Sequence, residues 1–479
     1  MSHNTMNYNL LVEEWIPVLM TDGQYRRVGI TDALRQAGRI REIAASNPMD
    51  RVAILRFLLA LLYWCNGNPP AESSPAHGDS FPLGWCAKLD DHEHCFNLLG
   101  EGKRFCQDPS ARRKRPATDL IQEIPTGNNF WHFRHSTDKE DGLCPACCAM
   151  GLLRLPLFSV SGRPDLKSGI NGKPPVYVLP WGMSLLQTLL ANWLPSTLLG
   201  EPSWVQPHAR LAPGQDVPLL TGLTLLSRRV WLGDPEQCGP CVSCGAAGSP
   251  VIRTCMFQSA GEQESADWDD PHVVYYGGEP RKSSRATDLT AAGKFRMDRP
   301  WPDLLARVLE SGKFQSQKAP VSLLIVGFAT DQAKSIDAWE RTIALPPGLP
   351  NKTEASLCAE RIEEWQRAGS SLARRLRPPN EKGSSRKHPE IASTMAAIRP
   401  QVEARVSARA TELIAGSDDA WGQAEEEYRP MVEVIARSLS SGFSSGAVRR
   451  REQIAKELSD SRPRANATGD TAGRKGVDR

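Results

Sequence analysis

The apolar pattern of the first thirty residues predicts a β-hairpin. Residues 8–18 (YNLLVEEWIPV) predict one strand, and the proline near its end favours an edge position or a strand terminus. Thr21-Asp22-Gly23 is a typical turn, and a second short strand is expected to run from it toward Ile30.

Two helices are expected next, and the second should be buried. Thr31 is a suitable N-cap for a short helix through Ala37 that Gly38 can end. Asn47-Pro48 is a start signal for a longer helix over residues 49–65. Because this second helix is apolar on every side, it is predicted to lie in the core.

Short apolar runs further along the chain predict four strands and one helix. The expected strands are 176–179, 219–231, 273–276 and 321–328, and the expected helix is 184–194. After the last of these strands, a turn could present Asp331 and Gln332 outward. Residues 1–350 are therefore predicted to form a large mixed domain.

The segment Pro346-Pro347-Gly348-Leu349-Pro350 breaks the pattern, and we place a domain boundary there. Beyond it, apolar residues recur at helical spacing in four segments, which predict a four-helix bundle over residues 351–460. Residues 461–479 are predicted to be a disordered tail. The predicted fold class is α+β, with the helical bundle following the mixed domain.

Residues 106–141 have few periodic apolar positions and are expected to form a long loop without secondary structure. The loop contains a basic run and an aromatic-basic cluster, which comprise Arg112, Arg113, Lys114 and Arg115, and Asn129, Phe130, Trp131, Phe133 and Arg134. Cations can meet phosphates while rings stack on bases, so the pattern suits a nucleic-acid strand. A solvated basic loop whose rings tuck into the domain fits the same residues equally well.

Composition and charge narrow the choice of partner and compartment. The 479 residues are 40% hydrophobic with a net charge of only +3, so a nucleic acid must be met by local basic patches. No window approaches 18 uninterrupted apolar residues, which argues against a membrane span. Residues 1–20 contain Glu13 and Glu14 and no basic region before an apolar core, so we expect no secretory leader and a cytoplasmic protein.

Two cysteine pairs, Cys144-Pro145-Ala146-Cys147 and Cys241-Val242-Ser243-Cys244, predict a structural Zn²⁺ site. Two residues between thiolates let both sulfurs face one tetrahedral ion, and four thiolates leave no open position for catalysis. The usual gap between such pairs is about 15–20 residues, so a substantial piece of domain is inserted here. Cys148 and Cys238 are close enough to replace one ligand, and four free thiols are the alternative interpretation.

Catalytic motifs are missing from the sequence. It contains no GxSxG, P-loop or HExxH motif. His92-Glu93-His94 could bind a catalytic metal, but adjacent side chains point in different directions and a solvated polar loop fits this triplet better. His132 and His135 are better candidates by spacing, although a histidine among aromatic residues and arginine more often packs or contacts phosphate. We expect a non-catalytic protein. The alternatives are a metal-dependent nuclease or other hydrolase, and a zinc-stabilised scaffold without DNA recognition.

Six segments occur in an order and at a spacing that resemble one known family. They are NLLVEEWIPV (9–18), DGLCPACCAMGLL (141–153), LKSGINGKPP (166–175), EPSWVQP (201–207), the second cysteine pair and IVGFATDQAKSI (325–336). Together with the predicted terminal bundle they resemble the CasA family, the large subunit of the type I-E CRISPR Cascade complex. The resemblance covers most of the chain.

The resemblance implies a subunit that reads a short flanking motif on duplex DNA while a guide RNA reads the target. By position, Gly162, Arg163 and Lys167 would approach the motif from the minor groove. The family's motif-reading lysine is replaced here within residues 256–259, so Gln258, or a basic pair in the next hairpin (Arg281 and Lys282), would take its role.

The resemblance also implies a glutamine wedge and a set of partners. Gln332, flanked by Asp331 and Ala333, would enter the duplex and start strand separation, since an amide can hydrogen-bond to exposed base edges. The loop 106–141 would contact the guide-RNA end and the backbone subunit. The expected partners are other Cascade subunits, crRNA, the double-stranded target with its displaced strand, and a recruited helicase-nuclease that does the cutting.

Overall fold

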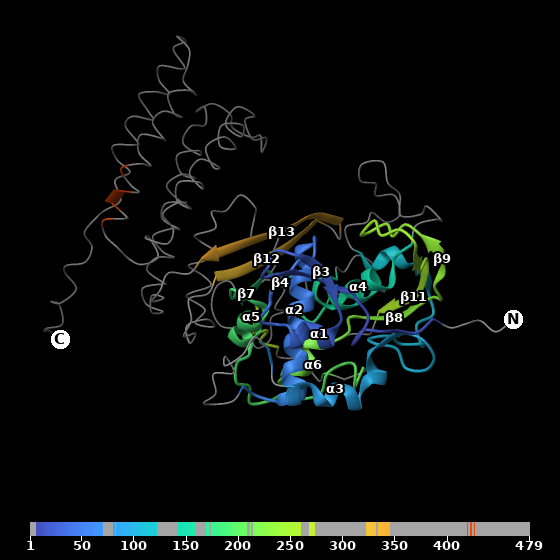
Figure 1. Cartoon of the computed structure of the whole chain (residues 1–479), viewed down its shortest axis with the longest axis horizontal. Coiled ribbons are helices and arrows are strands. Elements are labelled where there is room, and N and C mark those ends of the chain that lie inside the picture. Colours follow the sequence, from blue (N-terminus) through green and yellow to red (C-terminus); the bar gives the residue numbers. More distant parts are fainter. Residues whose placement is uncertain are drawn as a thin grey trace, which may run out of the picture. The chain divides into compact units, whose positions relative to one another are not determined.

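The computed structural model of the chain describes residues that belong to two compact units (Figure 1). The first unit comprises residues 1–296 and 316–347, and the second comprises residues 297–315 and 348–479. The described residues are 6–69, 80–81, 83–121, 142–159, 169–171, 174–207, 211, 214–259, 268–273, 322–331, 334–344, 419, 422–423 and 426. The predicted boundary after residue 350, the tail and nearly all of the predicted bundle lie outside these residues.

The N-terminal elements are one helix and four strands, three of which form a small antiparallel sheet. They are β1 (Tyr8–Asn9), β2 (Ile16–Met20), β3 (Tyr25–Val28), α1 (Ile30–Arg35) and β4 (Ile40–Ile43). The sheet order is β3-β2-β4, so the predicted hairpin is present as β2–β3. The single strand expected over residues 8–18 is wrong. Asn9 ends β1 because its side chain accepts from Leu11 N–H at 2.9 Å and its carbonyl accepts from Glu13 N–H.

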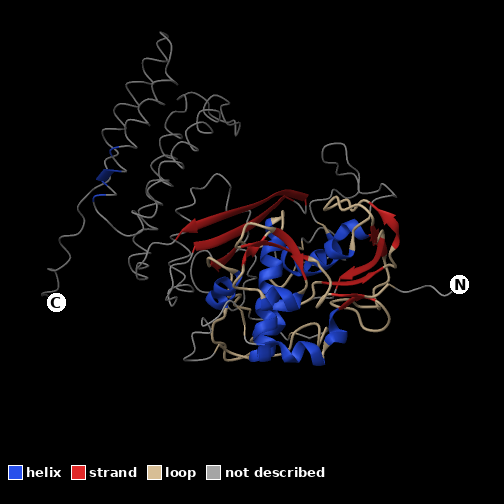
Figure 2. Ribbon diagram, in the orientation of Figure 1, coloured by secondary structure: helices blue, strands red, loops and turns tan. Residues whose placement is uncertain are grey.

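Helix α2 (Pro48–Asn66) runs through the middle of the first unit. The Asn47 side chain caps it by accepting from Met49 N–H at 2.8 Å, and Gly67 ends it with a positive φ of 72°. Its burial on all sides confirms the prediction, and helices α4, α5 and α6 pack against it. Figure 2 shows the other helices and the strands arranged around it. The ring of Phe57 lies 5.4 Å from that of Phe105 and 5.6 Å from that of Trp204.

The region after α2 contains six short elements, of which the last two lie inside the segment expected to be a loop without secondary structure. They are η1 (Leu83–Cys86), α3 (Ala87–Asp91), η2 (Glu93–Phe96), β5 (Asn97–Leu99), β6 (Lys114–Pro116) and η3 (Ala117–Leu120). The expectation of no secondary structure over residues 106–141 is therefore wrong for residues 114–120. Strand β6 forms because a distant partner, Cys255 in the second half of the chain, pairs with Arg115.

The central part of the chain alternates helices and strands. Its elements are α4 (Pro145–Phe158), β7 (Tyr177–Trp181), α5 (Leu185–Asn192), α6 (Leu219–Thr224) and β8 (Arg228–Leu232). The strand expected over residues 219–231 is wrong in its first half, which is helix α6. Trp268 packs where a Cβ on Gly222 would stand, at 2.3 Å, so this helix is shaped by a contact distant in sequence.

Two more three-stranded sheets and one two-stranded sheet follow in the described part of the first unit. The remaining strands are β9 (Glu236–Gly239), β10 (Ser249–Val251), β11 (Thr254–Ser259), β12 (Ser322–Asp331) and β13 (Lys334–Ala344). One three-stranded sheet has the order β6-β11-β8 and the other has the order β13-β12-β7, while β9 and β10 pair in the two-stranded sheet. The apolar run 321–328 is thus a buried strand, as predicted, and the mixed α/β character of the N-terminal part is confirmed. No helix in the described residues is long and apolar enough to cross a membrane.

Candidate metal centre and nucleic-acid contacts

The sulfur atoms of Cys144, Cys147, Cys241 and Cys244 all lie within 4.8 Å of one another. Cys144 caps the N-terminus of α4 and Cys147 lies in its first turn, while the second pair occupies the turn between β9 and β10. The Cys144 and Cys244 sulfurs are 3.8 Å apart. A tetrahedral zinc with Zn–S bonds of about 2.3 Å requires sulfurs about 3.8 Å apart, so the cluster fits this ion.

Backbone hydrogen bonds to sulfur further prepare the cluster for a cation. Cys144 N–H donates to the Cys241 sulfur at 3.3 Å, and Ala246 N–H donates to the Cys244 sulfur. Side-chain hydrogen bonds from Cys144 and Cys147 lower the pKa of Cys241, and one from Cys147 lowers the pKa of Cys244 to about 5. Hydrogen bonds with Cys144, Cys241 and Cys244 raise the pKa of Cys147. Because a metal ion binds the thiolate form of cysteine, a divalent cation bound here would displace the protons of these thiols.

Short backbone bridges join the two cysteine pairs, which are 97 residues apart. Gly142 pairs with Cys241 and Leu143 pairs with Ile252. The carbonyl of Gly142 accepts from Val242 N–H at 3.0 Å. Gly142 is needed here because a Cβ would lie 2.8 Å from the Val251 side chain. The site is therefore part of a junction between distant segments.

Of the other residues considered as metal ligands, Cys148 and His92 lie outside the cluster of four sulfurs. Cys148 is fully buried, its sulfur contacts the Leu143 carbonyl at 3.9 Å, and burial raises its pKa well above the ordinary value. The side chain of Cys238 is outside the described residues. His92 hydrogen-bonds through Nδ1 to the Lys88 carbonyl and packs edge-on against Trp64. In the part of the chain that the structure describes, the four cysteines are the one cluster able to hold a metal ion.

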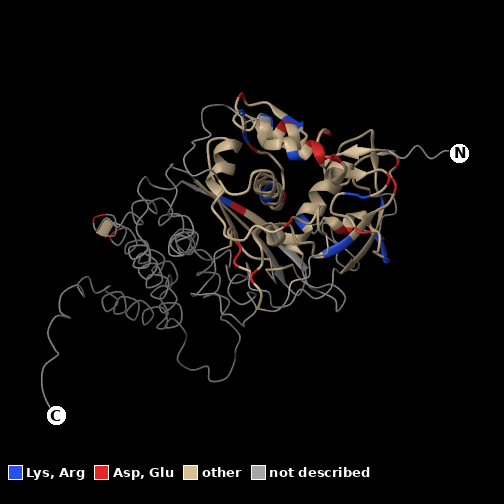
Figure 3. Cartoon of the chain, turned by 90° about the horizontal axis from the view of Figure 1, so that it is seen from below, with Lys and Arg blue, Asp and Glu red and all other residues tan. Residues whose placement is uncertain are grey.

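The basic run has described side chains at four positions. Arg112, Arg113 and Lys114 are exposed, whereas Arg115 forms an ion pair with Asp119. Figure 3 shows basic and acidic residues interspersed around the described part of this unit, as the weak net charge implies. The aromatic-basic cluster Asn129, Phe130, Trp131, Phe133 and Arg134 lies outside the described residues, as do His132 and His135.

The predicted DNA-contacting residues lie mainly in segments that the structure does not describe. Asp331 is the last residue of β12 and pairs with Lys334 in β13, so Gln332 and Ala333 connect the two strands. Gln332 and Ala333 themselves are outside the described residues, and so are Gly162, Arg163 and Lys167. The segment with the last three residues is bounded by described residues on both sides.

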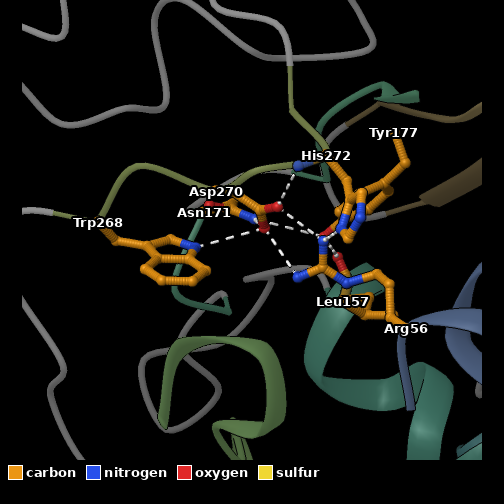
Figure 4. A network of polar contacts seen from close by, with 7 residues as sticks. All are labelled: Arg56, Leu157, Asn171, Tyr177, Trp268, Asp270 and His272. Atoms are coloured by element: carbon orange, nitrogen blue, oxygen red, sulfur yellow. Dashed lines mark hydrogen bonds and ion pairs between the residues drawn. The ribbon is translucent and has the colours of Figure 1, made fainter. Parts of the chain in front are cut away.

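A buried polar network next to that segment was not foreseen from the sequence (Figure 4). Arg56 on α2 donates two hydrogen bonds to Asp270, at 2.6 and 2.9 Å, and both side chains are at most 1% exposed. Asn171 donates to the same carboxylate at 2.9 Å, and the Trp268 indole donates at 3.3 Å. The one sequence signal was Arg56 itself, a charged residue in the middle of a predominantly apolar helix.

The network fixes the chain where the segment 160–168 ends. Asn171 lies two residues after Gly169, and Tyr177, whose hydroxyl is near Asn171, donates to the Leu157 carbonyl in α4. At the other end, Ser159 and Ser227 share a hydrogen bond of 2.8 Å. Burial alone raises the pKa of Asp270, but the charge and hydrogen bonds of Arg56 lower it well below its usual range. Buried hydrogen bonds of Ser159 and Asn171 therefore hold the chain on either side of the segment.

Fold and site together define a mixed α/β protein with a four-cysteine junction and a long β-hairpin. The family of the CRISPR-associated protein Cse1 matches residues 9–460, and the chain belongs to this family. The resemblance found in the sequence is thereby confirmed. The CRISPR-associated protein CasA/Cse1 of Thermus thermophilus is 26% identical over 375 residues, which are 71% of this chain and 72% of the relative.

Solved structures share the fold. CasA (Cse1) of Thermus thermophilus has a TM-score of 0.67 at 18% identity, with 95% of this chain and 100% of that chain covered. Cse1 of Acidimicrobium ferrooxidans has a TM-score of 0.66 at 19% identity, covering 95% and 98%. A chain of a CRISPR RNA-guided surveillance complex has a TM-score of 0.67 at 16% identity, covering 94% and 99%.

Proposed function

We propose that the chain is the non-catalytic large subunit of a crRNA-guided antiviral surveillance complex. It recognises a short motif beside the target in duplex DNA, starts strand separation and recruits a helicase-nuclease that cuts. Its partners are the other Cascade subunits, crRNA, and the target duplex with its displaced strand, in the cytoplasm. Membership of the Cse1 family and the shared fold with a chain of a surveillance complex support this proposal.

The β12–β13 hairpin is the observation that carries the proposal. Its ladder runs from Ser322↔Ala344 to Asp331↔Lys334, and β12 also pairs with β7. A wedge must resist bending when it meets stacked bases, and unstacking costs a few kcal/mol per step. A ladder of this length, whose strand β12 is buried in the sheet, can support a wedge at its end. Gln332 lies in the connection between the two strands and would be that wedge, with Asp331 and Ala333 beside it.

The remaining contacts follow from the same proposal. Gly162, Arg163 and Lys167 approach the flanking motif, and the firmly held ends of their segment favour a reproducible contact. The basic run at residues 112–115 and the aromatic-basic cluster that follows it contact the guide RNA and the backbone subunit. Residues 351–460 form the helical bundle that meets the small subunits, and residues 461–479 are a tail.

We infer that Zn²⁺ occupies the four-cysteine site in a structural role. The 3.8 Å sulfur separation and the backbone donors to sulfur support this choice. Four protein ligands would close the coordination sphere, so the ion would stabilise the junction between the two cysteine pairs and leave no position for a water molecule.

The experiment is strand opening by the assembled, crRNA-loaded complex on a matched duplex with 2-aminopurine beside the flanking motif. Gln332→Ala is expected to slow opening about tenfold, the equivalent of about 1.4 kcal/mol. Gln24→Ala is the matched control, because Gln24 is an exposed amide in the β2–β3 turn. If the Gln332→Ala complex opened the duplex at the wild-type rate, Gln332 would not be the wedge. Metal-dependent cutting of DNA by the chain alone would overturn the non-catalytic assignment.

A further inference from the structure

The sheet β6-β11-β8 has one buried face and one face toward solvent (Figure 1). Side chains alternate between the two faces along each strand. The side chains on the buried face include Cys255, Phe257, Val230 and Leu232. On the other face, cross-strand pairing places Lys114, Met256 and Trp231 in one row. In the next row Arg229 pairs with Gln258. These last five side chains make up the exposed sheet face.

The ring of Trp231 is held from one side by Arg104. The guanidinium lies over the indole, 4.5 Å from the ring centroid. Arg104 also donates hydrogen bonds of 3.0 Å to the carbonyls of Gly100 and Leu232, which fix its position. Met256, with 37% of its surface exposed, is the neighbour of Trp231 in the row. Because the ring is already ordered, a flat ligand that stacks on it loses little conformational entropy of the protein.

The exposed sheet face and its edge are positively charged. Asp108 forms an ion pair with Arg229 at 3.5 Å, and Asp234 lies 3.8 Å from the guanidinium that covers the tryptophan. Lys114 and Arg112 are exposed and add positive charge beyond these two pairs. The solvent face of an antiparallel sheet usually carries polar side chains. An ordered tryptophan ring and a methionine among cations therefore suit a polyanion that also offers flat, apolar groups.

We propose that the exposed sheet face binds a single-stranded segment of the guide RNA. Lys114 contacts phosphate and a base stacks on Trp231, a combination that tolerates any sequence because every base has a π-face. An unpaired base can lie on a flat sheet, whereas a duplex keeps its bases stacked inside. The choice of guide RNA rests on the function proposed above, which places the basic run 112–115 against that RNA. The inference extends this contact from β6 across β11 to β8.

Binding of RNA by the full chain tests the surface. The probe is a fluorescein-labelled oligouridine of about 10 nucleotides, followed by fluorescence anisotropy at several salt concentrations. The wild-type chain is expected to bind with a Kd of about 1–100 μM. Lys114→Gln should reduce the slope of log K against log salt by about 0.7, because one phosphate contact is lost. A loss of general stability does not produce this change in slope.

Substitution of the tryptophan tests stacking. Trp231→Ala should weaken binding about fivefold to 150-fold, and Trp231→Phe, which keeps a ring, should recover part of the loss. Arg26→Gln and Tyr25→Ala are the matched controls, because they remove an exposed cation and an exposed ring from β3 in a different sheet. Both controls should bind like the wild type. If Trp231→Ala does not fold, Lys114→Gln and Trp231→Phe still test the face.

Three results would overturn the inference. They are wild-type affinity and salt slope in the variants of Lys114 and Trp231, no binding by the wild type at about 100 μM, and equal competition by a DNA duplex of the same length. The strand-opening experiment is independent of these results. Slow opening by Gln332→Ala would keep the proposed function even if the RNA surface failed.

Discussion

Arg56 and Asp270 form a bidentate ion pair in the core, although 214 residues separate them in the chain. Removing one partner leaves the other charge buried and uncompensated, which costs about 3–5 kcal/mol. We therefore expect Asp270→Asn to lower the free energy of unfolding of the first unit by this amount. Urea denaturation followed by tryptophan fluorescence measures the change.

The double variant Arg56→Met/Asp270→Asn is the control for that result. It removes both charges, so its loss should be smaller than the sum of the two single losses. Losses that simply add would show that the two side chains do not stabilise each other.

Acid should weaken the same pair. The pKa of Asp270 in the folded state is below its unfolded value of about 3.9. The ionised carboxylate therefore contributes its full stabilisation of the fold above the unfolded pKa, and this stabilisation is lost as the pH falls through the folded pKa. The stability difference between wild type and Asp270→Asn should stay constant from pH 7 to about pH 5 and shrink below about pH 4. Urea midpoints at several pH values test this, and a difference that stays constant down to about pH 3 would contradict the shift.

Substitution of Cys244 should remove the metal, whereas substitution of Cys148 should not. We expect Cys244→Ala to lose the single bound zinc and Cys148→Ala to keep it, because the Cys148 sulfur faces the Leu143 carbonyl. Zinc at a thousand times its Kd adds about 4 kcal/mol of stability. Metal analysis and thermal unfolding with and without chelator measure both effects. Equal metal loss in the two variants would mean that Cys148 is a ligand.

Gly327 should tolerate no side chain. It pairs with Trp339 across the β12–β13 ladder, and a Cβ would lie 2.4 Å from the indole ring. Gly327→Ala is expected to cost about 1–3 kcal/mol through overpacking. Gly84→Ala is the matched control, since no atom lies within 4 Å of the position of its Cβ. Equal denaturation midpoints for the two variants would contradict this account.

The sequence correctly predicted those elements that are determined by residues close together in the chain. Asn47-Pro48 and an apolar run were enough to predict α2, and two CxxC pairs predicted which sulfurs meet. The strand expected at residues 219–231 failed because an apolar run of this length does not distinguish helix from strand. In the folded chain, Trp268 packs on Gly222 and the first half is helical.

The buried polar network could not be predicted from the sequence. The residues that donate hydrogen bonds to Asp270, Arg56 and Asn171, lie far away from it in the chain. An arginine in the middle of a buried, predominantly apolar helix indicates that a buried partner exists, but not which residue it is. The roles of Gln332, Gly162, Arg163 and Lys167 remain predictions for the same reason, since they depend on a nucleic acid.

The sequence separation of the residues that pair in the fold also determines how long the first partner is synthesised before the second. At about 5–20 residues per second, Cys144 leaves the ribosome about 5–20 s before Cys241, which lies 97 residues later. Asp270, which lies 214 residues after Arg56, emerges about 10–40 s later than Arg56. During that interval Arg56 lacks its carboxylate partner, and the first pair of thiols lacks the second pair, so neither junction can form until the later segment has emerged.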